Sequence, residues 1–248
     1  MTHDERPATA RAQAPSPPLA DGASIFIRLT DLVGRTITRC LTRVRVEGLD
    51  QARGLKGPVI VAANHASNAD GVLVACWITP AIRRRLYLLG KQEALEWPLA
   101  GLALRWNGVL GIRRGAADLE AFRAAKRVLD DGHVLAIFPE GTRSPTGVLR
   151  EAKDGLAILA LRTGATILPV GLANTDRFWP RGGRPRFGGW VGLRVGAPFT
   201  LEETTRGLNR RDAQAAATDE IMGQIAGLLP ERQRGAYADR ARGGSPPG

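Results

Sequence analysis

The chain has 248 residues, 44% of them hydrophobic, which is enough to bury one sizeable core in a single domain. Its formal net charge of +11 suggests an anionic partner, such as a nucleic acid, a phosphorylated metabolite, an acidic carrier protein or a membrane surface. No uncharged apolar stretch is long enough to cross a bilayer, so we expect no transmembrane span.

The two ends of the chain have the composition of disordered tails. Residues 1–22 are rich in proline, alanine and charge, and residues 231–248 finish in glycine, serine and proline. We therefore expect the folded domain over residues 45–230. The N-terminus lacks the apolar core of a signal peptide, so export is not expected. Cys40 and Cys76 lie in apolar segments without metal or redox spacing, and we expect both to be reduced core residues.

Residues 23–44 are predicted to form a basic amphipathic helix. Apolar residues recur there mostly at steps of three and four, at Ile25, Leu29, Leu32, Val33, Ile37, Cys40, Leu41 and Val44. The basic residues that fall largely to one side of this stripe are Arg28, Arg35, Arg39 and Arg43. Such a helix can lie in an anionic lipid interface, or it can pack its stripe on the domain. Both interpretations stay open.

From Val44 onward, short β-rich runs alternate with helical patterns. We expect strands near residues 44–47, 59–63, 85–89, 109–112, 133–138, 166–170 and 190–195. We expect helices near residues 70–79, 93–104, 116–130, 151–163 and 211–228. This alternation predicts a single-domain α/β sandwich whose mostly parallel sheet is flanked by helices. Ligands collect in such folds where strands end and helices begin.

The sequence NHASNAD, residues 64–70, follows a predicted buried strand. Ser67 or Asn68 is a natural N-cap, which would place Asp70 in the first helical turn. His65 would precede the cap, and an aspartate that accepts from one imidazole nitrogen leaves the other free to take a proton. This is the base half of a catalytic triad, and the nucleophile could be an alcohol of the substrate. A capping aspartate beside a loop histidine is the simpler alternative.

The sequence FPEGTRS, residues 138–144, follows a second predicted strand. Gly141 allows a close approach of the backbone to a ligand. Thr142 and Ser144 offer hydroxyl groups, and Arg143 presents a fork that suits a phosphate. A plain turn is the alternative.

Together these segments resemble the first and third sequence blocks of the glycerolipid acyltransferase family that includes 1-acylglycerol-3-phosphate acyltransferase. GVLGIRR, residues 108–114, is similar to the second block, and ILPV, residues 167–170, is similar to the fourth. The resemblance covers about residues 43–200, and four ordered blocks are far more specific than any one. Gly111 departs from the bulky residue that is usual in the second block, and Arg113 precedes Arg114. Which of these two arginines reaches a phosphate stays open.

The resemblance implies transfer of a fatty acyl chain from acyl-CoA or acyl carrier protein to the free hydroxyl of 1-acyl-glycerol-3-phosphate, which is phosphatidic acid synthesis. It implies that His65 is the base and Asp70 its partner. The residues that it assigns to substrate binding are Glu140, Gly141, Thr142, Arg143, Arg114 and Lys91. It implies no cofactor and no metal. We accordingly expect a peripheral protein on the cytoplasmic face of the cell membrane, bound to a lysophosphatidic-acid-like lipid.

Other functions remain to be weighed against this one. The acceptor could be a lyso-ornithine lipid, glycerol 3-phosphate or a lysophospholipid with a headgroup, and the chemistry would be the same. A nucleic-acid-binding module is suggested by the charge and by residues 177–187, which interleave cations and aromatic rings, but no nucleic-acid motif is present and we do not expect such a partner. An inactive lipid-binding protein would not need His65, Asp70 and Glu140. His133 opens a predicted strand, where a structural role is expected.

Overall fold

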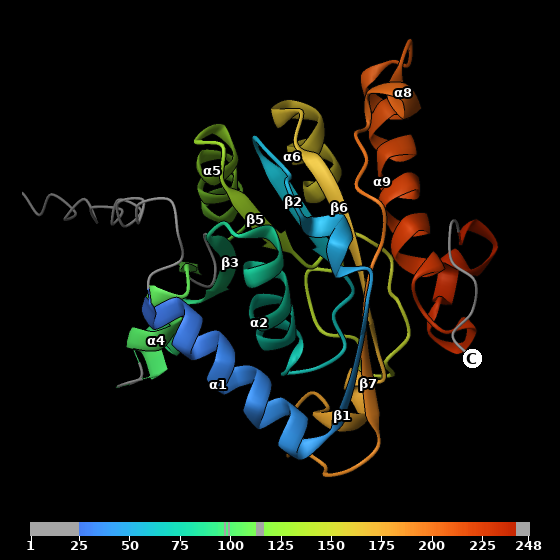
Figure 1. The fold of residues 1–248 in the computed structure, drawn as a ribbon. Helices are drawn as coiled ribbons and strands as arrows, with labels where there is room; N and C mark the ends of the chain where they lie inside the picture. The colour runs from blue at the N-terminus through green and yellow to red at the C-terminus, as the bar shows by residue number, and fades with distance from the viewer. Residues whose placement is uncertain (1–24, 97, 99, 113–116, 242–248) are drawn as a thin grey trace, which may run out of the picture.

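The computed structural model describes residues 25–96, 98, 100–112 and 117–241. Its strands form one seven-stranded sheet in the order β1-β7-β6-β2-β5-β3-β4 (Figure 1). The strands are β1 Arg43–Glu47, β2 Val59–Ala63, β3 Leu86–Lys91, β4 Val109–Ile112, β5 Val134–Ile137, β6 Thr166–Ala173 and β7 Trp190–Val195. Every neighbouring pair is parallel except β6 and β7. The predicted α/β fold with a mostly parallel sheet is confirmed.

The central strand β2 shows why the sheet is covered on both faces. All five residues of its VIVAA sequence are buried, as expected for a strand between two helical layers. Val59, Val61 and Ala63 pack into one core cluster, and Ile60 and Ala62 pack into the other. The alternation of side chains along a strand therefore divides the core into two layers.

Helices cover the two faces unequally. They are α1 Ile25–Leu41, α2 Asp70–Ile82, α3 Gln92–Leu95, α4 Ala100–Trp106, α5 Ala117–Asp130, α6 Gly155–Thr163, α7 Thr175–Phe178, α8 Glu202–Thr205 and α9 Arg210–Gly227. One core cluster joins the sheet to α2, and the other joins it to α5, α6 and α9. Helix α1 packs on α2, where Gly34 faces Cys76 so closely that an added Cβ would meet its sulfur at 2.4 Å.

Three predicted segments differ from the structure. The expected helix 93–104 is two short helices, α3 and α4, because Pro98 between them cannot serve in a helix interior. The expected helix 151–163 begins only at Gly155, since the preceding residues form a loop. The tail expected from residue 231 is wrong for 231–240, which form two 3-10 helices, Glu231–Gln233 and Gly235–Arg240. The expected tails 1–22 and 242–248 lie outside the described residues.

Helix α1 is amphipathic, but its apolar stripe is not what it buries. The helix ends at Leu41, three residues before the predicted end. Its exposed large apolar residues are Ile25, Leu29, Leu32, Val33 and Ile37. Its buried residues are Ile27, Asp31 and Thr38, and of the predicted stripe Leu41 and Val44 alone pack against the core. Cys40 is also exposed, which corrects the expectation of a core residue, whereas Cys76 is buried and both thiols are free.

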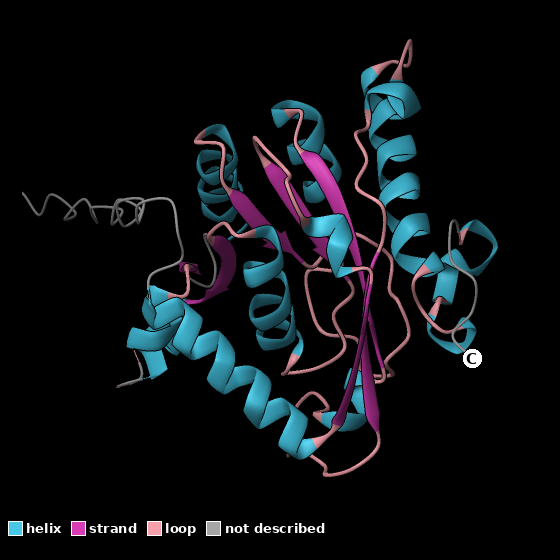
Figure 2. Ribbon diagram, in the orientation of Figure 1, coloured by secondary structure: helices cyan, strands magenta, loops and turns pink. Residues whose placement is uncertain are grey.

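Long loops gather at one end of the sheet, below the carboxyl ends of β2, β5 and β6 (Figure 2). These loops comprise residues 64–69, 138–154 and 174–189. The two sequence segments singled out above, 64–70 and 138–144, therefore meet at the end where parallel sheets bind ligands. No helix within the described ranges is both long enough and apolar enough to cross a membrane.

Candidate active site

The loop between β2 and α2 brings His65 and Asp70 together. His65 Nδ1 lies 2.8 Å from Asp70 Oδ2, and the side chains are 22% and 0% exposed. The same carboxylate oxygen accepts the backbone N–H groups of Ala66 and Ser67, each at 2.7 Å. This oxygen therefore faces three N–H donors at the N-terminus of α2. A carboxylate accepts only from a protonated Nδ1, which leaves the lone pair of Nε2 free in the neutral ring.

The predicted N-cap of α2 is wrong. The residue before the helix is Ala69, which has no capping side chain, and Asp70 is the first helical residue. Ser67 Oγ instead donates to the carbonyl of Trp179 at 2.8 Å and accepts the N–H of Ala69 at 3.0 Å. The Asp70 side chain thus turns back over the loop and binds backbone N–H groups that precede the helix.

The 138–144 turn holds His65 from the other side. The ring of Phe138 stacks on the imidazole with centroids 4.1 Å apart and planes 19° apart. The backbone N–H of His65 donates to Glu140 Oε1 at 2.6 Å, and the N–H of Ser144 donates to the carbonyl of His65 at 2.7 Å. Ring and backbone of His65 are therefore both fixed by this turn.

Glu140 points into the protein. It is 3% exposed, and its second oxygen accepts the backbone N–H of Arg150 at 3.2 Å. Burial raises the pKa of the Glu140 carboxyl to about 7, although the amide donors of His65 and Arg150 oppose the rise. Both oxygens are occupied by backbone groups, so the carboxylate links the His65 loop to the segment that follows the turn.

The outer part of the turn faces solvent. Gly141 has a φ of 68°, a left-handed conformation that favours glycine. An added Cβ there would lie 2.8 Å from Cδ of Lys153, whose side chain passes over the glycine. Thr142 and Arg143 are partly exposed and make no hydrogen bond to another described residue. Arg143 and Lys153 thus place two cations beside the His65 loop.

Lys153 was not singled out in the sequence. It stands in a stretch without motif character, and it reaches the turn only because its N–H donates to the carbonyl of Pro139 at 2.9 Å. The contact of residues 179–180 with the His65 loop was also missed. There the N–H of Asn68 donates to the carbonyl of Trp179 at 3.1 Å. The only available signal was the unusual composition of residues 177–187.

Two further predicted residues are placed incompletely. Lys91 is the last residue of β3, opposite Ile112 of β4, so its backbone lies at the same end of the sheet as His65. Arg113 and Arg114 lie outside the described residues. Gly111 has a packing role, since an added Cβ would lie 2.7 Å from Leu95 of α3.

Comparison with known proteins identifies the family of this chain. A family model described as Acyltransferase matches residues 43–173, a little over half of the chain. The 1-acyl-sn-glycerol-3-phosphate acyltransferase of Pseudomonas aeruginosa is 27% identical over 212 residues, which cover 82% of this chain and 77% of that protein. The lyso-ornithine lipid O-acyltransferase of the same organism is 36% identical over 132 residues, which cover 52% of this chain and 47% of that protein. The chain spans about half the length of most curated relatives that it matches.

A solved structure shares the fold. The crystal structure of the 1-acyl-sn-glycerophosphate acyltransferase PlsC from Thermotoga maritima superposes with a TM-score of 0.65 and 24% identity. The superposition covers 88% of this chain and 81% of that one.

Proposed function

Because this chain belongs to the acyltransferase family, we propose that it transfers a fatty acyl chain from a thioester to the free hydroxyl of 1-acyl-sn-glycerol-3-phosphate. The observation that carries the proposal is the 2.8 Å contact of His65 with Asp70 beside a turn that presents Arg143. A base for a hydroxyl and a cation for a phosphate monoester then lie within one site. The names of the curated relatives supply the acceptor.

His65 is the proposed general base. Nε2 takes the proton of the acceptor hydroxyl, and the oxygen attacks the thioester carbonyl. The tetrahedral intermediate collapses, the C–S bond breaks, and the thiolate takes the proton back from the imidazolium. Asp70 holds the ring and stabilises its positive charge during the transfer. The products are a new ester and a free thiol, and the proton count is balanced within the site.

Arg143 is the proposed contact for the phosphate of the acceptor, with Lys153 beside it. A guanidinium fork binds a phosphate monoester with two parallel hydrogen bonds. Lys91 and Arg114 keep the supporting role that the family resemblance implies. Glu140 is proposed to act as a positioning residue, since both of its oxygens already accept backbone donors.

The second candidate acceptor is a lyso-ornithine lipid, which has no phosphate. The 36% identity to a lyso-ornithine lipid O-acyltransferase favours it. The two acceptors offer Arg143 different anions, a phosphate monoester in one case and the carboxylate of ornithine in the other. The acyl donor is acyl-CoA or acyl carrier protein, both of which are anionic and suit a basic surface.

Membrane attachment through α1 belongs to the same proposal. The acceptor is a lipid, and the exposed residues Leu29, Leu32 and Ile37 give α1 an apolar face that can enter a lipid interface. We place the protein as a peripheral protein on the cytoplasmic face of the cell membrane.

The test is acyl transfer by the purified chain to a panel of lyso-lipids, followed by lipid mass analysis. We expect 1-acyl-sn-glycerol-3-phosphate to be the best acceptor, and Arg143→Ala to raise its KM about tenfold or more with kcat little changed. Arg206→Ala, at the far end of the sheet, is the control. Better turnover of lyso-ornithine lipid than of 1-acyl-sn-glycerol-3-phosphate would instead assign the second acceptor.

A further inference from the structure

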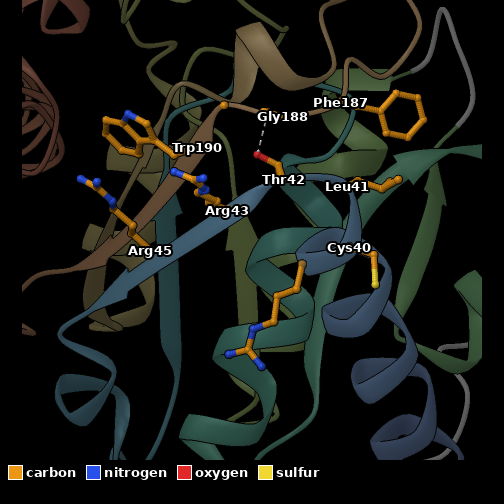
Figure 3. Close-up of a pocket in the computed structure, with 10 residues that line it drawn as sticks. Cys40, Leu41, Thr42, Arg43, Arg45, Phe187, Gly188 and Trp190 are labelled. Atoms are coloured by element: carbon orange, nitrogen blue, oxygen red, sulfur yellow. Dashed lines mark hydrogen bonds between the residues drawn. The ribbon is translucent and has the colours of Figure 1, made fainter.

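A pocket of about 440 Å³ lies where α1 meets the first residues of β1 and β7, apart from the His65 site (Figure 3). Its walls include Arg39 at the end of α1, Arg43 and Arg45 of β1, and Phe187 and Trp190 at the other side. Figure 3 shows Arg43 and Arg45 beside the Trp190 ring and Phe187 turned away from the strands. None of these residues takes part in the proposed acyl transfer.

The charges of this pocket are all positive. Its lining holds three arginines and no acidic residue. The nearest carboxylate on this face of β1, Glu47, pairs instead with Arg194 at 2.8 Å. Among the described residues, no ion pair is formed by Arg39, Arg43 or Arg45. The pocket therefore attracts an anion.

The pocket also has a defined shape. The guanidinium of Arg45 lies 4.8 Å from the centroid of the Trp190 ring, a cation–π contact that holds this side chain beside the aromatic wall of the pocket. The C-terminus of α1 carries partial negative charge on its free carbonyl groups, which would disfavour an anion. Two of these carbonyls already accept hydrogen bonds, because the N–H of Gly188 donates to Leu41 at 3.1 Å and the N–H of Thr42 donates to Thr38 at 2.9 Å. This repulsion is therefore reduced.

The pocket lies at the same end of the sheet as His65. Because β7 runs antiparallel to β6, and β1 is parallel to β7, the first residues of β1 and β7 lie where β2 and β6 end. The 174–189 loop touches both places, since Trp179 contacts the His65 loop and Phe187 lines the pocket. Phe187 is 78% exposed, and the exposed apolar face of α1 leads to the same end.

We propose that this pocket binds the phosphate of an anionic membrane phospholipid other than the acyl acceptor, and that this contact orients the protein on the bilayer. The inference rests on the membrane attachment proposed above. The arginines alone would suffice to bind a free anion. A phospholipid in a bilayer also accounts for the exposed apolar residues nearby, Phe187 and those of α1, because these can contact the acyl chains. The bound lipid turns the His65 end of the sheet toward the membrane.

The experiment measures binding of the full chain to sedimenting vesicles, either of phosphatidylcholine alone or of phosphatidylcholine with phosphatidylglycerol. For the double variant R43Q/R45Q we expect a loss of affinity of about tenfold to thirtyfold for the anionic vesicles. Binding to neutral vesicles should stay unchanged. The charge-matched control R206Q/R210Q changes the far end of the sheet and should lose less than about twofold. R43K/R45K keeps the charge but not the fork, and about a threefold loss is expected.

Several outcomes would overturn the proposal. Equal losses in the two glutamine pairs would show general electrostatic attraction, and unchanged binding in R43Q/R45Q would show that the pocket is not used. Binding of inorganic phosphate that R43Q/R45Q abolishes, together with unchanged vesicle affinity of that variant, would assign the pocket to a free anion. Salt-sensitive retention on duplex DNA that R43Q/R45Q abolishes, without any effect on vesicles, would assign it to nucleic acid.

Acyl transfer in neutral detergent micelles separates this inference from the proposed function. There R43Q/R45Q should turn over like the unmodified chain, because no anionic headgroup is needed. Absence of transfer in the unmodified chain would refute the proposed function while the vesicle result stands. Thermal unfolding of each variant verifies its fold.

Discussion

The His65 loop and helix α1 differ in the side chains that they bury and expose. The loop, residues 64–69, buries polar groups and pairs them, as Asn64 does with the backbone of Leu172 through bonds of 2.7 and 3.0 Å. Helix α1 leaves large apolar groups in solvent, with Leu29 at 56% and Ile37 at 52% exposure. Buried polar groups with full partners fix one geometry, and an exposed apolar face leaves a surface for a partner.

Two buried aspartates make the comparison sharper. Asp70 has three N–H donors on one oxygen. Asp31 of α1 is only 3% exposed, and burial raises its pKa to about 6 because the nearby charge of Arg35 compensates only in part. The His65 loop thus supplies donors to one oxygen of Asp70, whereas burial dominates at Asp31.

The largest expected effect comes from removing the charge of Asp70, beside the His65 loop. Asp70→Asn should lower kcat by about 10³-fold to 10⁴-fold, since the amide cannot stabilise an imidazolium. The acceptor KM should change little. The measurement is thiol release under saturating acceptor, with the exposed Asp131→Asn as the control. Retention of normal turnover by a folded Asp70→Asn protein would rule out the proposed dyad.

The next effect concerns Glu140, which ties the loop to the following segment. Glu140→Gln has one acceptor oxygen for two N–H donors, so we expect a loss of about 1–3 kcal/mol of unfolding free energy. Displacement of His65 should lower kcat by about tenfold to a hundredfold. Steady-state kinetics of Glu140→Gln, with the exposed Glu151→Gln as the control, distinguish a positioning role from a substrate-binding role. A higher acceptor KM at normal kcat would mean that Glu140 binds the substrate, as the family resemblance implied.

A smaller effect is expected on the exposed face of α1. Leu29→Gln removes an apolar side chain that would enter the lipid, so vesicle affinity should fall about tenfold. The melting temperature should not fall, because the side chain is largely exposed. Leu208→Gln, at an exposed apolar residue of the far end, is the matched control. Equal vesicle affinity of both variants would show that the exposed face of α1 does not contact the lipid.

The smallest effect tests the inner face of α1. The folded pKa of Asp31, about 6, is above its ordinary value of 3.8, so the fold binds the proton more tightly than the unfolded chain. Stability therefore falls as pH rises from about 4 to about 6, and stays lower above that range. Asp31→Asn should be more stable than the unmodified chain by about 1–2 kcal/mol at pH 7, and the two should converge near pH 4. Denaturant unfolding measures this, with Asp239→Asn as the control.

Much of the fold could be read from the sequence because its signals are local. The strands at residues 59–63, 109–112 and 190–195 have the predicted bounds. The first two are short, mostly apolar runs between turn residues, and the third alternates buried residues with less buried ones. The amphipathic pattern of α1 was equally clear. Its orientation was not, because periodicity describes a stripe and does not say whether protein or solvent covers it.

The candidate site was predictable only in part for the same reason. The sequence indicated His65, Asp70 and the 138–144 turn, whose residues follow one another along the chain. It did not indicate that Lys153 would reach the 138–144 turn or that Trp179 would contact the His65 loop, because both contacts are backbone hydrogen bonds between separate loop segments. The family resemblance implied that Glu140 binds substrate, and the sequence could not show its inward direction, because the donors that hold it come from other segments.

The Glu140 contact also sets an order in which the protein can become active. The bond from His65 to Glu140 joins positions 75 residues apart, and the second bond needs Arg150. A chain emerging from the ribosome has the histidine long before it has either partner. The proposed base therefore lacks both contacts of Glu140 until more than half of the chain has been synthesised, and α1 emerges ahead of this arrangement.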